Sequence, residues 1–260
     1  QYAIQVVMSF MMLVMIFMLL PRASVSAKRI QAVLDTDPSI IDGTETDSNC
    51  NASGTIEFKN VSFHYPDEEE CVLKNITFTA KKGETVALIG STGCGKSTVI
   101  NLIPRFYDAS EGQVLVDGID VRKYPQKELR NKIGYVSQKA TLFTGTIRSN
   151  VAYGDNGQPS ASQEDVKNAI ATAQATDFVE NLGDQYDAYV AQGGSNFSGG
   201  QKQRISIARA IARHPEILIF DDSFSALDYK TDRILRKTLE ETCKDTTRII
   251  VAQRIGTIRD

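Results

Sequence analysis

The chain has 260 residues, with 29 Lys and Arg against 32 Asp and Glu, a formal net charge of −3 and four cysteines. At roughly 150 residues per domain, this length predicts one full globular domain and an appended segment. The small net charge argues against a chain-wide grip on nucleic acid, so we predict no nucleic-acid partner. The composition excludes collagen and disordered chains. The widely spaced cysteines, without a C-x-x-C pair, indicate neither a disulfide framework nor a zinc site and favour a reducing, cytosolic setting.

The first twenty residues carry no charge and form an almost unbroken apolar run. A helix of that length spans about 30 Å, the thickness of a bilayer core, so we predict a transmembrane helix over residues 1–21. A buried soluble helix is one alternative. A signal peptide is another, but it needs an initiator Met and a charged region ahead of the apolar run, and the chain starts at Gln1. Arg22, Lys28 and Arg29 follow directly, and the positive-inside rule places the rest in the cytoplasm.

Residues 22–54 are predicted to connect this helix to a globular domain. Apolar positions in residues 22–34 suit a short amphipathic helix, whereas residues 41–54 are rich in Asp, Thr, Ser, Asn and Gly and indicate an exposed linker. We therefore expect the globular domain to cover residues 55–260. Because the chain begins in the apolar run without Met, we expect it to be a fragment.

From residue 55 the pattern is that of an α/β domain. Apolar and polar side chains alternate over residues 55–65, with one register slip near Lys59 and Asn60, which predicts bulged antiparallel strands. Residues 163–182 carry apolar side chains at helical spacing and predict a helical insertion. Further strands are predicted at residues 72–79, 85–89, 113–116, 133–136 and 217–220, the last two in a central sheet, with a helix near 98–103 and a hairpin turn at Asp117 and Gly118.

A phosphate-binding motif follows the strand at 85–89. Residues 90–97 match G-x-x-x-x-G-K-[ST], and a chance match is disfavoured by the strand before it and the helix after it. In such a loop, backbone N–H groups surround phosphate oxygens, the lysine reaches the β- and γ-phosphates and the final hydroxyl binds Mg²⁺. We predict that ATP binds through Gly90, Ser91, Thr92, Gly93, Cys94, Gly95, Lys96, Ser97 and Thr98; Cys94 is interpreted as a tolerated small residue rather than a redox device.

A metal-bound nucleotide needs a further carboxylate from another strand of the same sheet. Residues 217–220 form an apolar run that ends at Asp221, and ligands of open α/β sheets collect at the carboxyl ends of strands. An aspartate after an apolar run is a weak signal alone, but together with the loop it predicts a metal ligand.

A third motif leads to a family. The sequence Ser198-Gly199-Gly200-Gln201, shortly before the Asp221 strand, resembles the signature of ATP-binding cassette (ABC) transporter ATPase domains. A plain turn before a helix would explain the glycines but not the neighbouring motifs. The resemblance covers residues 55–260. It implies a P-loop ATPase fold of the α/β class, with a RecA-like core, an antiparallel β subdomain and a helical subdomain.

The resemblance also implies roles for single residues, with ATP and Mg²⁺ as cofactors. Tyr65 corresponds to the aromatic that stacks on adenine, although a core aromatic at a strand end is the simpler alternative. Gln138 corresponds to the Q-loop glutamine, with catalytic and metal-binding roles, and Asp228 belongs to the D-loop. In this family two domains pack head to tail, so that Ser198, Gly199, Gly200 and Gln201 would contact the ATP of the partner's site.

Residues 142–151 contain a T-I-R-x-N pattern that resembles exporters of the multidrug and peptide type. In these exporters the membrane part precedes the ATPase on one chain. The resemblance implies that residues 1–21 are the last transmembrane helix of a multi-pass protein of the cell membrane, with a cytoplasmic ATPase domain. It also implies that further strands and helices follow residue 260.

Two positions depart from the family pattern. Asp222 stands where hydrolysing members carry the glutamate that orients the attacking water, and Gln253 stands in place of the switch histidine. Asp222 is one methylene shorter, and losing a positioned base costs about 10²–10⁴-fold in rate. Two such changes at one nucleotide site resemble the degenerate-site subunit of a heterodimeric exporter. Gln192, where exporters often carry Glu, fits a specialised partner interface.

Three alternatives remain. They are a homodimer that hydrolyses ATP slowly with Asp222, a DNA-repair or chromosome-structure ATPase, and a nucleotide sensor without transport. The second would need a long coiled coil between the loop and the signature, and only about 100 residues without heptads separate Ser97 from Ser198. The transported substrate cannot be predicted, because the other membrane helices lie outside this sequence.

Overall fold

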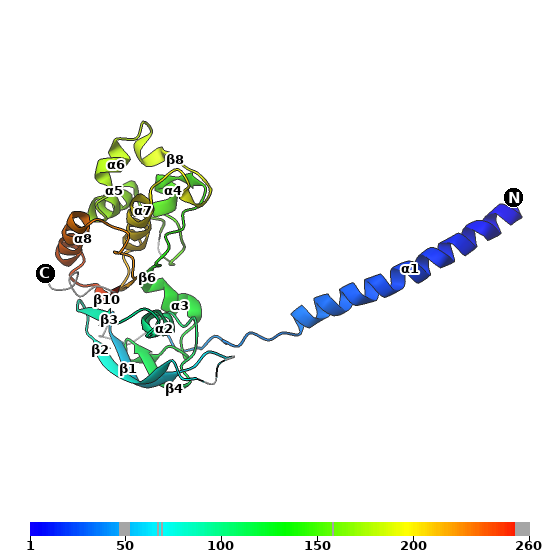
Figure 1. Cartoon of the computed structure of the whole chain (residues 1–260), viewed down its shortest axis with the longest axis horizontal. Coiled ribbons are helices and arrows are strands. Elements are labelled where there is room, and N and C mark those ends of the chain that lie inside the picture. The colour runs from blue at the N-terminus through cyan, green and yellow to red at the C-terminus, as the bar shows by residue number, and fades with distance from the viewer. Residues whose placement is uncertain (47–52, 67, 69, 158, 253–260) are drawn as a thin grey trace. The chain divides into compact units, whose positions relative to one another are not determined.

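The computed structural model describes residues 1–46, 53–66, 68, 70–157 and 159–252. Figure 1 labels the elements along the chain. The chain divides into two compact units, the first from Gln1 to Ile41 and the second from Asp42 onward. Each unit is described by itself.

The first unit is a single helix, α1, at Tyr2–Leu34. It continues through Pro21 and therefore runs across the predicted boundary between the membrane helix and the connector. Its side chains are exposed, and its most apolar 18-residue window has a mean hydropathy of 2.5. By length and composition alone, α1 is able to cross a membrane. The helix ends where Asp35 N–H donates to the carbonyl of Gln31, shortly before Pro38.

The second unit begins with a segment that contacts the domain rather than lying free as a linker. Gly43 N–H donates to the carbonyl of Tyr124, and Glu45 N–H donates to that of Lys123. A Cβ atom at Gly43 would overlap the backbone of Lys123, so this close approach requires glycine.

An antiparallel sheet has the strand order β2-β1-β4-β5. The register between β1 and β2 shifts after Phe58, near Asn60, whose φ is 47°. The predicted bulged antiparallel strands are thus confirmed. The strands are β1 (Ile56–Phe63), β2 (Leu73–Ala80), β4 (Glu111–Val116) and β5 (Ile119–Asp120).

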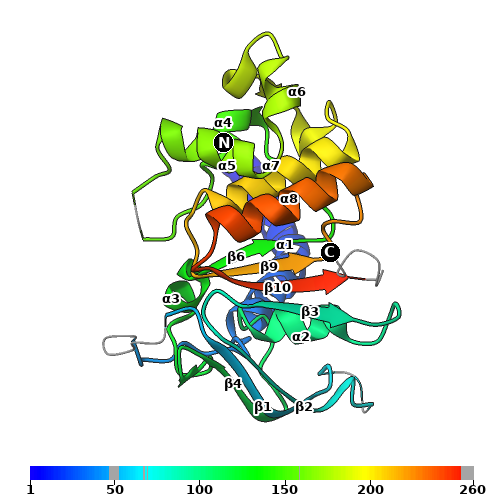
Figure 2. The same cartoon turned by 90° about the vertical axis from the view of Figure 1, so that its left-hand side faces the viewer.

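A parallel sheet has the order β3-β10-β9-β6, and its two faces belong to different cores. Along β9, Ile217 and Ile219 pack with the antiparallel sheet, whereas Leu218 and Phe220 pack with the helices on the other side. Burial of both faces explains the unbroken apolar run. In Figure 2, α7 and α8 lie over one face and α2 lies on the other. The elements are β3 (Thr85–Ile89), β10 (Thr247–Ala252), β9 (Ile217–Asp221), β6 (Ile133–Val136), α2 (Lys96–Leu102) and α8 (Tyr229–Thr242).

The remaining helices include the predicted insertion, which gathers at one end of this unit (Figure 1). The helical run expected at residues 163–182 is interrupted near Gln174, where φ is 56°, and so forms two helices. The elements are α3 (Gln126–Asn131), α4 (Ile147–Val151), α5 (Gln163–Thr172), α6 (Thr176–Glu180), α7 (Gly199–Ile211), the short strands β7 (Gly145–Thr146) and β8 (Tyr189–Val190), and 3₁₀ turns at Gln185–Asp187 and Gln192–Gly194.

Candidate functional site

The phosphate-binding motif forms the turn between β3 and α2. Gly93 and Gly95 have φ values of 85° and 88°, in the left-handed region that favours glycine. A Cβ at Gly95 would lie only 2.9 Å from the Leu73 side chain, which gives a second reason for glycine there. The loop therefore turns tightly and leads from β3 into α2, which packs against one face of the parallel sheet.

Lys96 brings a positive charge to the inside of this loop. Its Nζ donates to the carbonyls of Gly90 and Ser91, each at 2.7 Å, and lies 3.6 Å from Cys94 Sγ. These contacts hold the ammonium group over the loop. An anionic ligand seated there would meet both this charge and the backbone N–H groups of the turn.

Ser97 and Asp221, separated by 124 residues in sequence, meet at the carboxyl edge of the parallel sheet. Ser97 Oγ donates to Asp221 Oδ1 at 2.9 Å, and Tyr135 Oη donates to Asp221 Oδ2 at 3.4 Å. Burial raises the pKa of Asp221; the hydrogen bonds from Ser97 and Tyr135 oppose this rise, and the neighbouring Asp222 adds to it. A cation near Asp221 would oppose this rise and stabilise the charged carboxylate.

Gln138 reaches across to the residue after Asp221. Its Nε2 donates to Asp222 Oδ2 at 3.2 Å, so its amide oxygen is the atom left to face a ligand. Asp222 is 8% exposed and has a φ of 45°, while Ser225 Oγ donates to its backbone carbonyl at 2.7 Å. Hydrogen bonds therefore restrain Asp222 at two points, its carboxylate through Gln138 and its backbone carbonyl through Ser225.

The donor set around this edge fits Mg²⁺. The Ser97 hydroxyl, the Asp221 carboxylate and the Gln138 amide supply oxygen ligands, which Mg²⁺ prefers together with substrate phosphates. Among the described residues there is no group of three or more His, Cys, Asp and Glu side chains that could hold a metal on their own. Such a site would bind the cation only jointly with phosphate oxygens.

These side chains line a cavity of about 350 Å³. Of the residues predicted from sequence, the cavity brings together Tyr65, Thr92, Gly93, Gly95, Lys96, Ser97, Thr98, Gln138, Asp221 and Asp222. Val72 and Val251 also line it and were not predicted. Gln253 lies outside the described residues.

Tyr65 stands at the wall of the cavity with its hydroxyl 3.0 Å from Thr98 Oγ1. Its ring makes edge contacts with Phe63 and Tyr107, at centroid distances of 5.0 and 5.3 Å. Tyr107 and Tyr135 were missed by the sequence analysis. The only sequence signal for Tyr135 was that its side chain carries a hydroxyl group in an otherwise apolar strand at residues 133–136.

The signature lies at the start of α7 and does not line this cavity. Ser198 is the N-cap residue: Gln201 N–H donates to Ser198 Oγ, and Ser198 N–H donates to Gln201 Oε1. A Cβ at Gly199 would meet nothing within 4 Å, whereas one at Gly200 would lie 3.2 Å from the carbonyl of Ala226. Packing within the described chain thus gives a reason for glycine only at position 200.

Asp228 is the N-cap residue of the next helix. Its carboxylate accepts hydrogen bonds from Thr231 N–H at 3.0 Å and from Thr231 Oγ1 at 2.7 Å, at the start of α8. Capping lowers the pKa of Asp228, with the Thr231 side-chain hydrogen bond as the largest cause. The predicted D-loop therefore lies between β9 and α8, and Asp228 caps α8.

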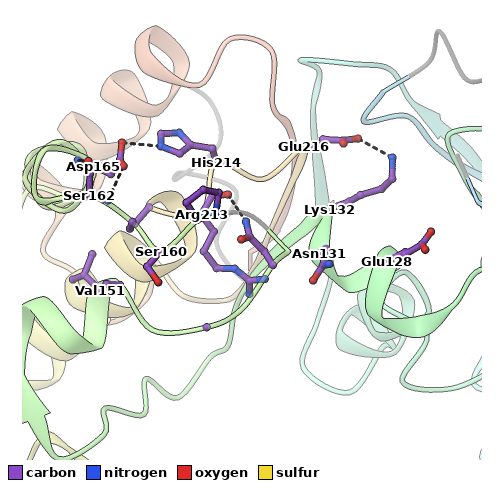
Figure 3. Close-up of a pocket in the computed structure, with 16 residues that line it drawn as sticks. Glu128, Asn131, Lys132, Val151, Ser160, Ser162, Asp165, Arg213, His214 and Glu216 are labelled. Carbon is purple, nitrogen blue, oxygen red and sulfur yellow. Dashed lines mark hydrogen bonds and ion pairs between the residues drawn. The ribbon is translucent and has the colours of Figure 1, made fainter. Parts of the chain in front are cut away.

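A larger cavity of about 780 Å³ lies elsewhere, lined by α3, the segment between α4 and α5, and the turn after α7. Figure 3 shows the ion pair of Lys132 with Glu216, the hydrogen bond between His214 and Asp165, and the Arg213 side chain among the lining residues. The described lining includes none of the residues predicted from sequence for ATP, metal or signature contacts. We therefore assign the nucleotide site to the smaller cavity.

Comparison with known proteins identifies the family. Residues 73–225 match the family described as ABC transporter. Over 257 residues, covering 98% of this chain, the chain is 43% identical to an ABC transporter ATP-binding protein of Mycobacterium tuberculosis strain H37Rv, of which it covers 44%. Over 239 residues, covering 92% of this chain, it is 41% identical to an ATP-dependent lipid A-core flippase of Haemophilus influenzae, of which it covers 40%.

A solved bacterial Atm1-family ABC exporter with ATP bound has a TM-score of 0.85 and 35% identity, with 95% of this chain and 42% of that chain covered. This likeness confirms the expected ATPase fold. The chain spans less than half of the length of these relatives. Since the matched region, residues 73–225, makes up more than half of the sequence, the chain belongs to the ABC transporter family.

Proposed function

We propose that this chain is the ATP-binding part of an exporter half-transporter, which binds MgATP in the smaller cavity and couples ATP binding and hydrolysis to export. The observation that carries this proposal is the 2.9 Å contact between Ser97 and Asp221 beneath the phosphate loop. This contact brings two oxygen ligands suited to a metal into the same cavity as Lys96 and the phosphate loop. Bound Mg²⁺ would neutralise charge on the phosphates, while Lys96 and the loop amides hold them.

Export is supported by the relatives and by α1. One relative is named a lipid A-core flippase, and a protein of Staphylococcus aureus that is 44% identical over 226 residues is named a putative multidrug export protein. The length and apolarity of α1 fit a membrane-spanning segment. We place the protein in the cell membrane as a multi-pass transporter, with residues 1–21 in the bilayer, residues 22–54 as connector and residues 55–260 as a cytoplasmic ATPase domain.

Head-to-tail pairing is supported by the open space at Gly199. Contacts with the described residues do not require glycine there, yet glycine leaves the N-terminus of α7 accessible. A 13-residue helix offers free N–H groups and a favourable dipole to an anion at this end. A phosphate of the partner's ATP would be recognised by Ser198, Gly199, Gly200 and Gln201, with Asp228 beside them.

The partner is proposed to be a different half-transporter. Asp222 has one methylene less than glutamate, and its carboxylate already accepts a hydrogen bond from Gln138. Its reach toward an attacking water is therefore short, and Gln253 cannot carry the positive charge of a protonated histidine. The chain's own site would bind ATP and hydrolyse it poorly, while the partner's site performs most of the hydrolysis. A slow homodimer remains the second candidate, since Asp222 still lines the cavity as an acid.

Equilibrium binding of a fluorescent ATP analogue to the full-length transporter tests the nucleotide site. Lys96→Ala removes the ammonium group from the loop and is expected to weaken binding by at least about tenfold, because charge-assisted hydrogen bonds contribute roughly 1.5–3 kcal/mol. Asp222→Ala is the matched control and is expected to leave affinity nearly unchanged. Unchanged affinity in Lys96→Ala would remove the phosphate-loop assignment.

A further inference from the structure

We propose that Gln203 is a positioning residue, which places Gln138 for its metal contact by holding the backbone next to it. This inference rests on the proposed function of the smaller cavity. Gln203 lies on α7, five residues after the signature serine, and is only 1% exposed. Its Nε2 donates to the carbonyl of Ser137 at 3.2 Å. Ser137 is the first residue after β6 and directly precedes Gln138.

The same helix holds the segment after β6 at a second point. Arg209 Nη1 donates to the carbonyl of Thr141 at 2.9 Å, and Arg209 Nε donates to the carbonyl of Asn150 at 2.8 Å. Gln138 lies between the two anchored carbonyls of Ser137 and Thr141. Its position over the cavity is therefore set by α7 and not only by the sheet that precedes it.

Burial of the Gln203 amide carries a desolvation cost in free energy that an apolar side chain at this position would avoid. Several residues that follow Gln203 on α7, among them Ile205 and Ile207, are buried in the helical core. Burying an amide there is unfavourable unless its hydrogen bonds are formed. The bond to Ser137 offsets part of that cost and also fixes one peptide group beside Gln138. The structure thus assigns Gln203 a role at the nucleotide site, although its side chain does not line the cavity.

The consequence is a path of contacts from the signature to the metal ligands. Ser198 caps α7, and Gln203 lies about 7.5 Å further along the helix axis, given a rise of 1.5 Å per residue. Gln203 holds Ser137, and Gln138 then contacts Asp222 at 3.2 Å. A displacement of α7 would pull the Gln138 amide from the cavity.

The test compares the affinity of the full-length transporter for a fluorescent ATP analogue with and without Mg²⁺. The Mg²⁺ gain is defined as the dissociation constant without Mg²⁺ divided by that with Mg²⁺. It measures how much the metal contacts strengthen binding. Gln203→Met keeps the length of the side chain and removes the donor. It is expected to reduce the Mg²⁺ gain by about three- to tenfold, the effect of one hydrogen bond, and to leave Mg²⁺-free affinity unchanged.

Gln138→Ala is expected to cause a similar loss, and the double variant is expected to lose no more than Gln138→Ala alone, because both changes act on one contact. Gln203→Leu serves as a second variant if Gln203→Met does not fold. Ser206→Ala, at a buried serine three residues along α7, is the matched control for packing and is expected to keep the full Mg²⁺ gain.

Three results would overturn the inference. The first is an unchanged Mg²⁺ gain in Gln203→Met or Gln203→Leu with affinity unchanged. The second is an unchanged gain with affinity weakened equally with and without Mg²⁺, as a purely structural role predicts. The third is losses that multiply in the double variant. If the unaltered protein binds no ATP analogue, the proposed function fails and this inference fails with it. If the unaltered protein shows a Mg²⁺ gain that the Gln203 variants retain, the inference alone fails.

Discussion

The side-chain amide of Gln138 donates a hydrogen bond to the carboxylate of Asp222 across 3.2 Å. This contact joins the segment after β6 to the residue that follows β9, at the edge where Ser97 and Asp221 also meet. Asp222 is buried, and its left-handed backbone, with a φ of 45°, restricts where its carboxylate lies. Its capacity to act as a base thus depends on a short side chain that is already hydrogen-bonded.

The first prediction concerns the division of work between the two ATP sites. Asp222→Ala is expected to reduce the ATPase rate of a heterodimer only by a small factor, because Asp222 is a poorly placed base. Ser198→Arg is expected to lower the rate by about 10²–10⁴-fold, since a long side chain at the start of α7 would occupy the space of the partner's phosphate. Steady-state ATPase and transport assays rank the two variants.

Ser198→Ala is the matched control for this pair. It also loses the helix cap, at a cost of about 0.5–2 kcal/mol, but adds no bulk. Its rate should therefore fall less than that of Ser198→Arg. If Asp222→Ala abolishes turnover as completely as Ser198→Arg, the heterodimer proposal is wrong and the slow homodimer is the better account.

The second prediction separates the partner interface from folding. Gly199→Ala is expected to leave the thermal stability unchanged or slightly raised, because its Cβ would meet no described atom within 4 Å and alanine is the better helix former. ATP-dependent association with the partner is expected to weaken. Gly200→Ala is the comparison, because its Cβ would press on the carbonyl of Ala226 at 3.2 Å.

Thermal denaturation and light scattering with ATP measure these two effects. Gly200→Ala is expected to lower the melting temperature, whereas Gly199→Ala is not. Normal association of Gly199→Ala would contradict the assignment of the signature to the partner's site.

The third prediction concerns the buried ion pair between Lys132 and Asp117. Lys132 Nζ contacts Asp117 Oδ2 at 2.7 Å, and the side chains are 13% and 0% exposed. Lys132→Met would leave the Asp117 carboxylate without this partner and is expected to lower the free energy of unfolding by about 3 kcal/mol or more. Chemical denaturation measures it.

Glu216→Gln is the control for this change. Glu216 contacts the same ammonium at 3.2 Å but is 35% exposed, so its loss is expected to cost less than about 1 kcal/mol. Equal costs for the two variants would show that burial of Asp117 does not decide the stability of this region.

The fourth prediction concerns the pH dependence of the α5 cap. The side-chain hydrogen bond from Ser162, the N–H of Ser162 and then His214 lower the pKa of Asp165 to about 2. Because this folded pKa lies below the ordinary value of 3.8, the contact stabilises the fold above about pH 4, and its contribution is lost as the pH falls toward 2. Ser162→Ala is expected to raise the pKa of Asp165 more than His214→Ala does. An NMR titration of the Asp165 carboxylate checks this order, and a larger rise in His214→Ala would reverse it.

Several parts of the fold follow from local sequence. The strand-loop-helix around residues 90–97 was predictable, because an apolar strand, glycines with left-handed φ values and a lysine at the helix start all act over short range. The bulge near Asn60 was readable from the register slip in alternation. The buried strand ending at Asp221 was visible as an unbroken apolar run, since both faces of a parallel strand are covered.

The tertiary structure alone decided which distant residues meet. The strand order β3-β10-β9-β6 brings the end of β9 to the start of α2, and only this arrangement places Asp221 2.9 Å from Ser97. The sequence pattern carried no signal for Gln203, because a polar residue on a helix is usually exposed. Here the helix packs that amide against the carbonyl of Ser137. Likewise, the break near Gln174 divides a periodic run, since burial of α5 and α6 against the core outweighed local helical preference. Short-range geometry thus determined the motifs, whereas the order in which strands and helices pack determined the site.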